Sequence, residues 1–169
     1  MNQFLVIIRG APASGKTTIA KKMRNFDERV AWLKVDNFKD FFSEDPAGAT
    51  KYVDGSAIAT LEYLLNQGFS VIMEKIFLDP VAITTAVEMA KNINIPVKVF
   101  QIKCSLQTLQ ERDKTRPGVR EGCRKPLGDE VIAGMHQKLE ETFYEGAVVL
   151  DTEKMSVEEC AQVISESFK

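Results

Sequence analysis

Gly10-Ala-Pro-Ala-Ser-Gly15-Lys16-Thr17 follows directly on the apolar run Phe4-Leu-Val-Ile-Ile8. This stretch matches the pattern G-x-x-x-x-G-K-[ST] of phosphate-binding loops at every fixed position. The pattern has structural meaning only between a strand and a helix. Residues 4–8 predict the strand and residues 17–23 the helix, so the sequence indicates a nucleotide-binding α/β fold.

The residue types in this loop suit an anion. Gly10 and Gly15 have no Cβ, so the backbone can fold closely around a phosphate with its N–H groups pointing inward. The helix that starts near Lys16 adds unsatisfied N–H groups and the positive end of its dipole. Lys16 can reach the β- and γ-phosphates, and the Thr17 hydroxyl can reach Mg²⁺. We therefore expect ATP and Mg²⁺ as cofactors, with the nucleotide bound by Gly10, Ala11, Pro12, Ala13, Ser14, Gly15, Lys16, Thr17 and Thr18.

Length and composition are those of an ordinary globular chain. The 169 residues fit one domain (1–169), with 44% hydrophobic and 27% charged residues. The net charge of −2 hides an asymmetry, because residues 112–125 hold six basic and two acidic side chains. Three widely spaced cysteines favour neither a disulfide framework nor a zinc site. The apolar N-terminal stretch is too short for a signal peptide or a membrane span, so we expect a cytoplasmic protein.

Apolar runs alternate with amphipathic stretches along the whole chain, which is typical of βα units around a parallel sheet. Continuous apolar strands favour a sheet with helices on both faces. The predicted strands are 4–8, 31–35, 70–74, 97–103 and 147–151. After the helix at 17–23, further helices are predicted at 54–67, 81–92, 105–116, 128–144 and 156–167, with caps at Asp54, Asp79, Ser105 and Ser156.

Asp36 follows the second predicted strand, at the end where open α/β sheets bind ligands. A carboxylate there can accept a proton from a hydroxyl group that attacks the γ-phosphate. The alternative is a capping role, because residues 36–42 are typical of a short helix that begins with Asp. We favour a catalytic role, and one residue can serve both.

Glu74 ends the third predicted strand and precedes Lys75. An acid at a strand end beside a phosphate-binding loop can hold magnesium or its water shell. With Thr17, it is the expected metal-binding residue. The alternative is a Glu74–Lys75 pair of surface charges.

Arginines gather after the fourth predicted strand. Arg112 and Arg116 lie four apart on one helix face, and Arg120 and Arg124 continue that spacing beyond Pro117-Gly118. Guanidinium groups that close over the phosphates stabilise transition-state charge and exclude water. The alternatives are a favourable interaction with the helix dipole and a nucleic-acid patch, although the run has no interleaved aromatic residues. We expect catalytic roles for Lys16, Asp36, Arg112 and Arg116, with a lid over about 112–127.

In order and spacing, these motifs resemble the P-loop kinases that include chloramphenicol phosphotransferase, zeta toxins and the kinase domain of polynucleotide kinases. The segments that carry the resemblance are GAPASGKTT (10–18), VDNF (35–38), GFSVIMEKIFLD (68–79), VFQIKCSLQTLQERDKTR (99–116) and VVLDTEKMSVEECAQVI (148–164). The resemblance implies a five-stranded parallel sheet of order 2-3-1-4-5 and a magnesium-ATP phosphotransferase with Asp36 as the base. One position departs: Lys39 stands where zeta toxins and polynucleotide kinases have the arginine of D-x-x-R.

The sequence thus predicts a kinase that moves the γ-phosphate of ATP to a hydroxyl of a small molecule, such as an antibiotic-like or metabolite-like acceptor. A nucleotide or polynucleotide 5′-hydroxyl kinase is the first alternative. The second is an ATP-binding regulatory or toxin-like protein without small-molecule kinase activity. We expect a monomer or weak homodimer with no membrane or nucleic-acid partner.

Overall fold

The computed structural model describes residues 3–42, 49–116 and 125–169. Five strands within these ranges form one parallel sheet of order β2-β3-β1-β4-β5, which confirms the expected fold class and strand order. The strands are β1 (Leu5–Gly10), β2 (Val30–Lys34), β3 (Ser70–Glu74), β4 (Val97–Lys103) and β5 (Val148–Asp151). Each lies within two residues of its predicted bounds.

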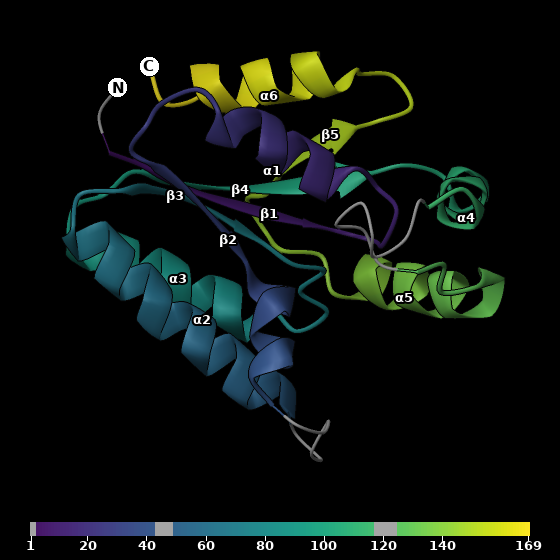
Figure 1. Ribbon diagram of the computed structural model, residues 1–169. Coiled ribbons are helices and arrows are strands. Elements are labelled where there is room, and N and C mark those ends of the chain that lie inside the picture. The colour runs from purple at the N-terminus through teal and green to yellow at the C-terminus, as the bar shows by residue number, and fades with distance from the viewer. Residues whose placement is uncertain (1–2, 43–48, 117–124) are drawn as a thin grey trace.

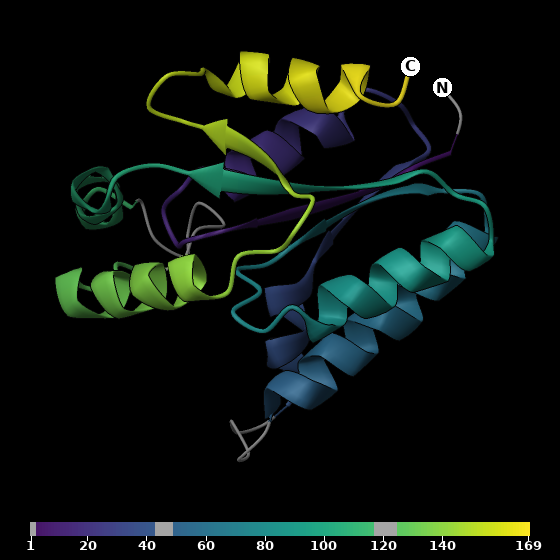
Figure 2. The same cartoon turned by 180° about the vertical axis from the view of Figure 1, so that it is seen from behind.

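Helices cover both faces of the sheet (Figures 1 and 2). Helices α1 (Lys16–Arg24) and α6 (Val157–Glu166) lie on one face, and α2 (Ala49–Asn66) and α3 (Val81–Asn92) on the other. Strand β1 contributes side chains to the hydrophobic core on both faces of the sheet. Leu5 and Ile7 pack toward α2 and α3, and Val6 and Ile8 pack toward α1 and α6. Burial on both faces explains why residues 5–8 of β1 and 71–73 of β3 are hydrophobic in succession rather than alternating.

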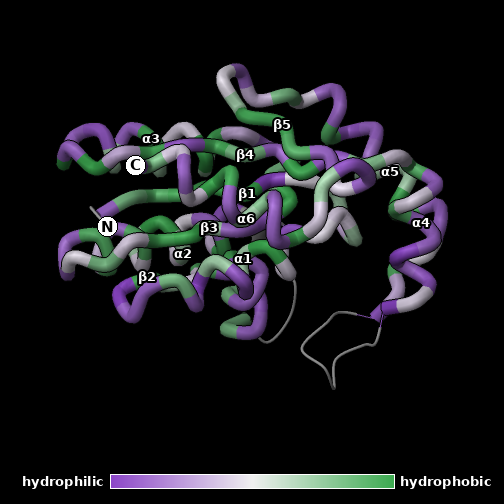
Figure 3. The backbone as a smooth tube through the Cα atoms, turned by 90° about the horizontal axis from the view of Figure 1, so that it is seen from above, coloured by the Kyte–Doolittle hydropathy of each residue, from purple (hydrophilic) through white to green (hydrophobic). Residues whose placement is uncertain are grey.

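The helices present one apolar stripe each to this sheet. Figure 3 shows this as an alternation of hydrophobic and hydrophilic colour along the helical turns. In α2, Val53, Ala57, Leu61 and Leu65 recur every four residues and are all buried. This spacing places them on one side of the helix, and that apolar side packs against the sheet.

Two helix starts follow the predicted capping chemistry. The Ser105 hydroxyl accepts a hydrogen bond from the Thr108 backbone N–H at the start of α4 (Leu106–Lys114). Ser156 and Glu159 form a reciprocal capping box at the start of α6. Such caps satisfy backbone donors that a helix leaves unpaired at its first turn.

The predicted cap at Asp54 is wrong. Helix α2 already begins at Ala49, so Asp54 lies inside it. Its carboxylate is used elsewhere, because Lys75 Nζ donates to Asp54 Oδ1 at 2.5 Å. The sequence could not reveal this partner, which lies 21 residues away along the chain.

The carboxyl ends of the strands face α4 and α5 (Asp129–Glu141), which lie together beyond the end of the sheet (Figure 1). The phosphate-binding loop between β1 and α1 opens toward the same end. The fold therefore gathers the loop, the strand ends and α4 and α5 around one region. No helix in the described part of the chain has the length and apolar character needed to cross a membrane.

Candidate active site

The phosphate-binding loop is fixed by glycine at two positions. Gly10 has a φ of +154°, and a Cβ there would lie 2.5 Å from the Ile102 carbonyl oxygen. Gly15 has a φ of +98° and forms the N-cap of α1. Both conformations disfavour any residue with a Cβ. The glycine spacing thus shapes a loop that wraps the first turn of α1, where backbone N–H groups attract an anion.

Lys16 lies inside this loop with only 8% of its surface exposed. Its Nζ donates to the Ala11 carbonyl oxygen at 2.8 Å, so the side chain folds back over the loop. Burial lowers the pKa of Lys16, and the Glu74 and Asp36 carboxylates partly counteract this shift. A buried ammonium beside open N–H groups makes the loop strongly attractive to a phosphate.

Thr17 and Glu74 meet at the start of α1. Thr17 Oγ1 donates to Glu74 Oε1 at 2.8 Å, and the Trp32 indole Nε1 donates to Glu74 Oε2 at 3.2 Å. Glu74 is 5% exposed and Lys75 is 7% exposed, so the alternative of a surface charge pair is wrong. A hydroxyl oxygen and a carboxylate are hard oxygen donors of the kind that Mg²⁺ prefers, and the two groups fit this ion.

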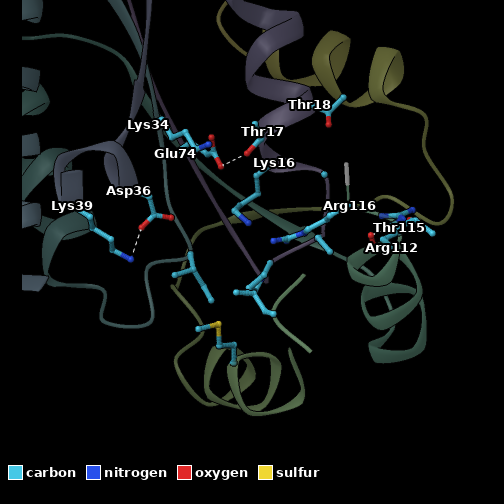
Figure 4. A pocket seen from close by; sticks show the side chains of 16 residues that line it. Lys16, Thr17, Thr18, Lys34, Asp36, Lys39, Glu74, Arg112, Thr115 and Arg116 are labelled. Carbon is cyan, nitrogen blue, oxygen red and sulfur yellow. Dashed lines mark hydrogen bonds and ion pairs between the residues drawn. The ribbon is translucent and has the colours of Figure 1, made fainter. Parts of the chain in front are cut away.

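Asp36 follows β2, within the 3₁₀ helix η1 (Val35–Phe41). The N-cap of η1 is Lys34, so Asp36 belongs to the first turn instead of capping the helix. Lys39 Nζ approaches Asp36 Oδ1 to 3.0 Å, and the two side chains meet at the edge of the cavity (Figure 4). Lys39 therefore supplies a positive charge next to this carboxylate.

The two arginines of α4 and its end have different surroundings. Arg112 donates to both the carbonyl and hydroxyl oxygens of Thr152, each at 2.9 Å. Arg116 extends toward Lys16 (Figure 4) and forms an ion pair with Asp113, whose Oδ1 lies 3.1 Å from Arg116 Nε. Arg112 is thus bound to the loop after β5, whereas Arg116 is directed at the phosphate-binding loop.

Asp113 is a structural link beside this site that the sequence pattern does not reveal. It is buried, and its Oδ2 accepts the backbone N–H groups of Leu127 and Gly128 at 2.7 and 3.0 Å. It therefore joins both sides of the predicted lid. The expected lid residues Arg120 and Arg124 lie outside the described residues, as does all of 117–124. An acid within a basic run is a weak signal, because most such residues are solvated.

These groups surround a cavity of about 410 Å³. The volume is in the range of small-molecule sites in proteins. Ile76, Leu127 and Met135 give it an apolar side, and Asp36 and Lys39 lie at the edge of the same space (Figure 4). The charged lining residues are Lys16, Lys34, Lys39, Arg112, Arg116, Asp36 and Glu74. The excess of basic groups favours anionic ligands.

The fully buried Arg9 of β1 is a second side-chain link that the sequence pattern does not reveal. It donates to the Phe77 carbonyl oxygen through Nε and Nη2, at 3.3 and 3.1 Å. It also donates to Gln101 Oε1 at 3.2 Å and to Thr142 Oγ1 at 2.9 Å. Burial lowers the pKa of Arg9. Arg9 therefore links the turn after β3, which has Phe77 at a φ of +50°, to the residue that follows α5.

Comparison with known proteins identifies the family to which this chain belongs. The profile of the AAA domain family AAA_33 matches residues 5–142. No curated protein matches the chain. The tunicamycin resistance protein of Deinococcus radiodurans superimposes with a TM-score of 0.71 at 14% identity, covering 99% of this chain and 96% of that one.

Two further solved structures share the fold. Kti12 of Chaetomium thermophilum, in complex with ADP-AlF3, gives a TM-score of 0.70 at 16% identity, covering 96% of this chain and 97% of that one. A sugar kinase from a Janibacter species gives 0.68 at 17% identity, covering 97% and 93%. The chain therefore belongs to the AAA domain family AAA_33, and its fold is that of the P-loop kinases that the sequence resembles.

Proposed function

We propose that the protein is an ATP- and Mg²⁺-dependent phosphotransferase that moves the γ-phosphate of ATP to a hydroxyl group of a small molecule. The observation that carries this proposal is that one cavity is lined both by the phosphate-binding loop, with Lys16 and Thr17, and by Asp36. Nucleotide binding accounts for Glu74, which lies beside Thr17 at the expected Mg²⁺ position, but it does not account for Asp36 as a second carboxylate in the same cavity. A kinase needs one as the proton acceptor.

The nucleotide is held by the loop from Gly10 to Thr18. Its phosphates replace the Ala11 carbonyl as the partner of Lys16, which gives that buried ammonium an opposite charge. Thr17 and Glu74 would hold Mg²⁺, which neutralises phosphate charge when bound. The structure of Kti12 contains ADP-AlF3, and this fold therefore accommodates a nucleotide in that protein.

Transfer needs a base, an acceptor and charge stabilisation. The acceptor hydroxyl gives its proton to Asp36, its oxygen forms a bond to the γ-phosphorus, and the bond from that phosphorus to the β–γ bridging oxygen breaks, leaving ADP. Lys39 keeps the Asp36 carboxylate in place through their 3.0 Å ion pair. Arg116 and Lys16 lie on the phosphate side and stabilise the charge on the transferring group.

The acceptor is expected between Asp36 and the apolar side of the cavity. Ile76, Leu127 and Met135 can pack against the body of the acceptor while Asp36 receives its hydroxyl group. An acceptor with an apolar portion next to a hydroxyl group satisfies both. We expect the protein to act without a membrane or nucleic-acid partner.

The test is transfer of labelled γ-phosphate from ATP in Mg²⁺ to a panel of amino-alcohol antibiotics, nucleosides, sugars, sugar nucleotides and 5′-hydroxyl oligonucleotides. Asp36→Asn is expected to lower the rate about 10²–10⁴-fold, with little change in nucleotide affinity. The matched control is Asp40→Asn, an exposed acid of the same 3₁₀ helix that does not line the cavity, and it should turn over like the wild type.

Three results would contradict the proposal. If Asp36→Asn transfers phosphate as fast as Asp40→Asn, Asp36 is not the base. If the protein binds ATP but labels no acceptor of the panel, a regulatory nucleotide-binding role is favoured. Labelling of the oligonucleotides alone would instead establish the polynucleotide kinase.

A further inference from the structure

The carboxylate of Glu74 has a hydrogen-bond donor on each of its two oxygens. Thr17 Oγ1 binds Oε1 at 2.8 Å and the Trp32 indole N–H binds Oε2 at 3.2 Å. We propose that Trp32 is a positioning residue of the metal site, whose indole N–H fixes the orientation of Glu74 toward Thr17 and Mg²⁺. This inference rests on the metal site of the proposed function, and it assigns a role to a residue outside the cavity lining.

The pleat of the sheet explains how Trp32 reaches Glu74. Trp32 pairs with Ile72 across β2 and β3, and Lys34 pairs with Glu74. Side chains two residues apart on a strand share a face, so all four point toward α1. Glu74 is therefore the diagonal neighbour of Trp32, two residues nearer the carboxyl end of the sheet than Ile72. The long indole spans this offset, which a shorter donor at position 32 would not.

The chemistry of the indole suits a supporting role. Its N–H can only donate, so it complements an ionised carboxylate and does not coordinate a cation. A donor on Oε2 limits rotation of the carboxylate and keeps Oε1 on the Thr17 hydroxyl. Groups of this kind behind a metal ligand set its orientation, and their loss commonly costs 10–100-fold in metal affinity or activity.

The position of the ring is itself restrained. Trp32 is half-buried and packs against the core between the sheet and α1. The Arg24 guanidinium carbon and Lys34 Nζ each lie 5.9 Å from the centre of its ring. Such cation–π contacts hold an aromatic ring in place. Trp32 is thus a rigid donor, as a positioning residue requires.

A purely structural role for Trp32 predicts a different result, because a packing residue affects stability but not the metal dependence. The first measurement is the affinity for ADP by calorimetry over a Mg²⁺ series and in EDTA. Trp32→Phe keeps the ring and removes the N–H. We expect the apparent Mg²⁺ affinity of this variant to fall about 10-fold, with ADP affinity in EDTA unchanged.

The control variant is Lys22→Gln, which removes a cation of the same helix that pairs with Glu158 and leaves the ring and its N–H untouched. It should bind Mg²⁺ and ADP like the wild type. A second, wild-type measurement does not depend on the folding of Trp32→Phe. Because the chain has one tryptophan, its ¹⁵N-labelled indole gives a single N–H resonance. We expect that resonance to move when Mg²⁺ is added to the ADP-bound protein, and to move in the free protein on Glu74→Gln.

The outcomes separate this inference from the function on which it rests. If ADP affinity of the wild type does not depend on Mg²⁺, the metal site itself fails and the role of Trp32 fails with it. If the ADP affinity depends on Mg²⁺ to the same extent in the wild type and in Trp32→Phe, only the role of Trp32 is overturned. The role of Trp32 is also overturned if its indole resonance moves neither on addition of Mg²⁺ nor on Glu74→Gln.

Discussion

The buried ammonium group of Lys16 has an energetic cost in the absence of a ligand. Its pKa is lowered by burial, which means that the folded protein holds the Lys16 proton less tightly than the unfolded chain does. Function and stability therefore oppose one another at this residue. The proposed phosphate binding needs the charge, whereas the nucleotide-free fold is more stable without it.

We predict that Lys16→Met abolishes ATP binding and raises the melting temperature of the nucleotide-free protein at neutral pH. The stability advantage should shrink as the pH rises. Between the lowered pKa and the ordinary value of 10.5, the unfolded wild type binds the extra proton, so the stability of the wild type increases with pH in that window. Melting curves of both proteins from pH 7 to 10 measure this. A difference in melting temperature between Lys16→Met and the wild type that widens with pH would contradict the prediction.

The two arginines are predicted to differ in kinetics. Arg116→Gln should lower kcat about 10²–10³-fold with little change in the KM for ATP, because Arg116 is directed at the phosphate-binding loop. Arg112→Gln should mainly raise the KM for ATP, because Arg112 holds Thr152 instead. Steady-state kinetics of both variants distinguish these roles. Equal losses of kcat would show that both guanidinium groups act on the transferring phosphate.

At the scale of elements, α4 is joined to the end of the sheet by the loop that follows β5. Glu153 in that loop accepts hydrogen bonds from the Ser105 backbone N–H, at 2.9 Å, and from the Ser105 and Thr108 hydroxyls. The bonds from Thr108 and Ser105 lower the pKa of Glu153 to about 2. The start of α4, and with it Arg112, is therefore held by an ionised carboxylate.

We predict that this link is lost only in strong acid. Because the folded pKa lies below the unfolded value of 4.5, the stabilisation is full above pH 4.5 and disappears as the pH falls toward 2. An NMR titration of the Glu153 carboxyl carbon should show a midpoint near pH 2. In Glu153→Gln, amide exchange in the first turn of α4 should be faster at pH 7. A midpoint near 4.5 would mean that the hydrogen bonds do not persist in solution.

The elements that the sequence predicted well are those with a strong local pattern. The five strands and most helix ends follow from apolar runs and caps such as Ser105 and Ser156. Local signals failed where a distant partner decides the structure. The sequence around Asp54 is typical of a helix cap, but in the fold Asp54 pairs with Lys75. Helix α5 ends at Glu141 rather than at residue 144.

The candidate site divides in the same way. The loop glycines, Lys16, Thr17, Asp36 and Glu74 stand at fixed offsets from strand ends, so topology brings them together. Trp32, Asp113 and Arg9 act through side-chain hydrogen bonds to residues that only the fold places nearby. Their roles depend on rotamers and pleat, which no pattern of residue types encodes.

For the whole molecule, nucleotide binding is predicted to act as a stabilising ligand. At 100 times its dissociation constant, Mg-ADP should add about 2.7 kcal/mol to the free energy of unfolding, which corresponds to about 5–10 °C in melting temperature for a chain of this size. Thermal denaturation with and without Mg-ADP measures the shift. Lys16→Met is the control and should show none. A shift of equal size in that variant would place the nucleotide outside the loop.

The order of the strands also places the residues proposed to face the acceptor at a different strand from those proposed to bind the nucleotide. In the sequence β2-β3-β1-β4-β5, Asp36 and Lys39 follow one edge strand, the phosphate-binding loop follows the central strand, and Thr152 follows the opposite edge. Under the proposed function, mutations in η1 can thus alter which compound is accepted while the phosphate-binding loop stays unchanged. A lineage built on this sheet would then diversify its acceptors through changes beside one edge strand, and a laboratory library confined to η1 would sample the same variation.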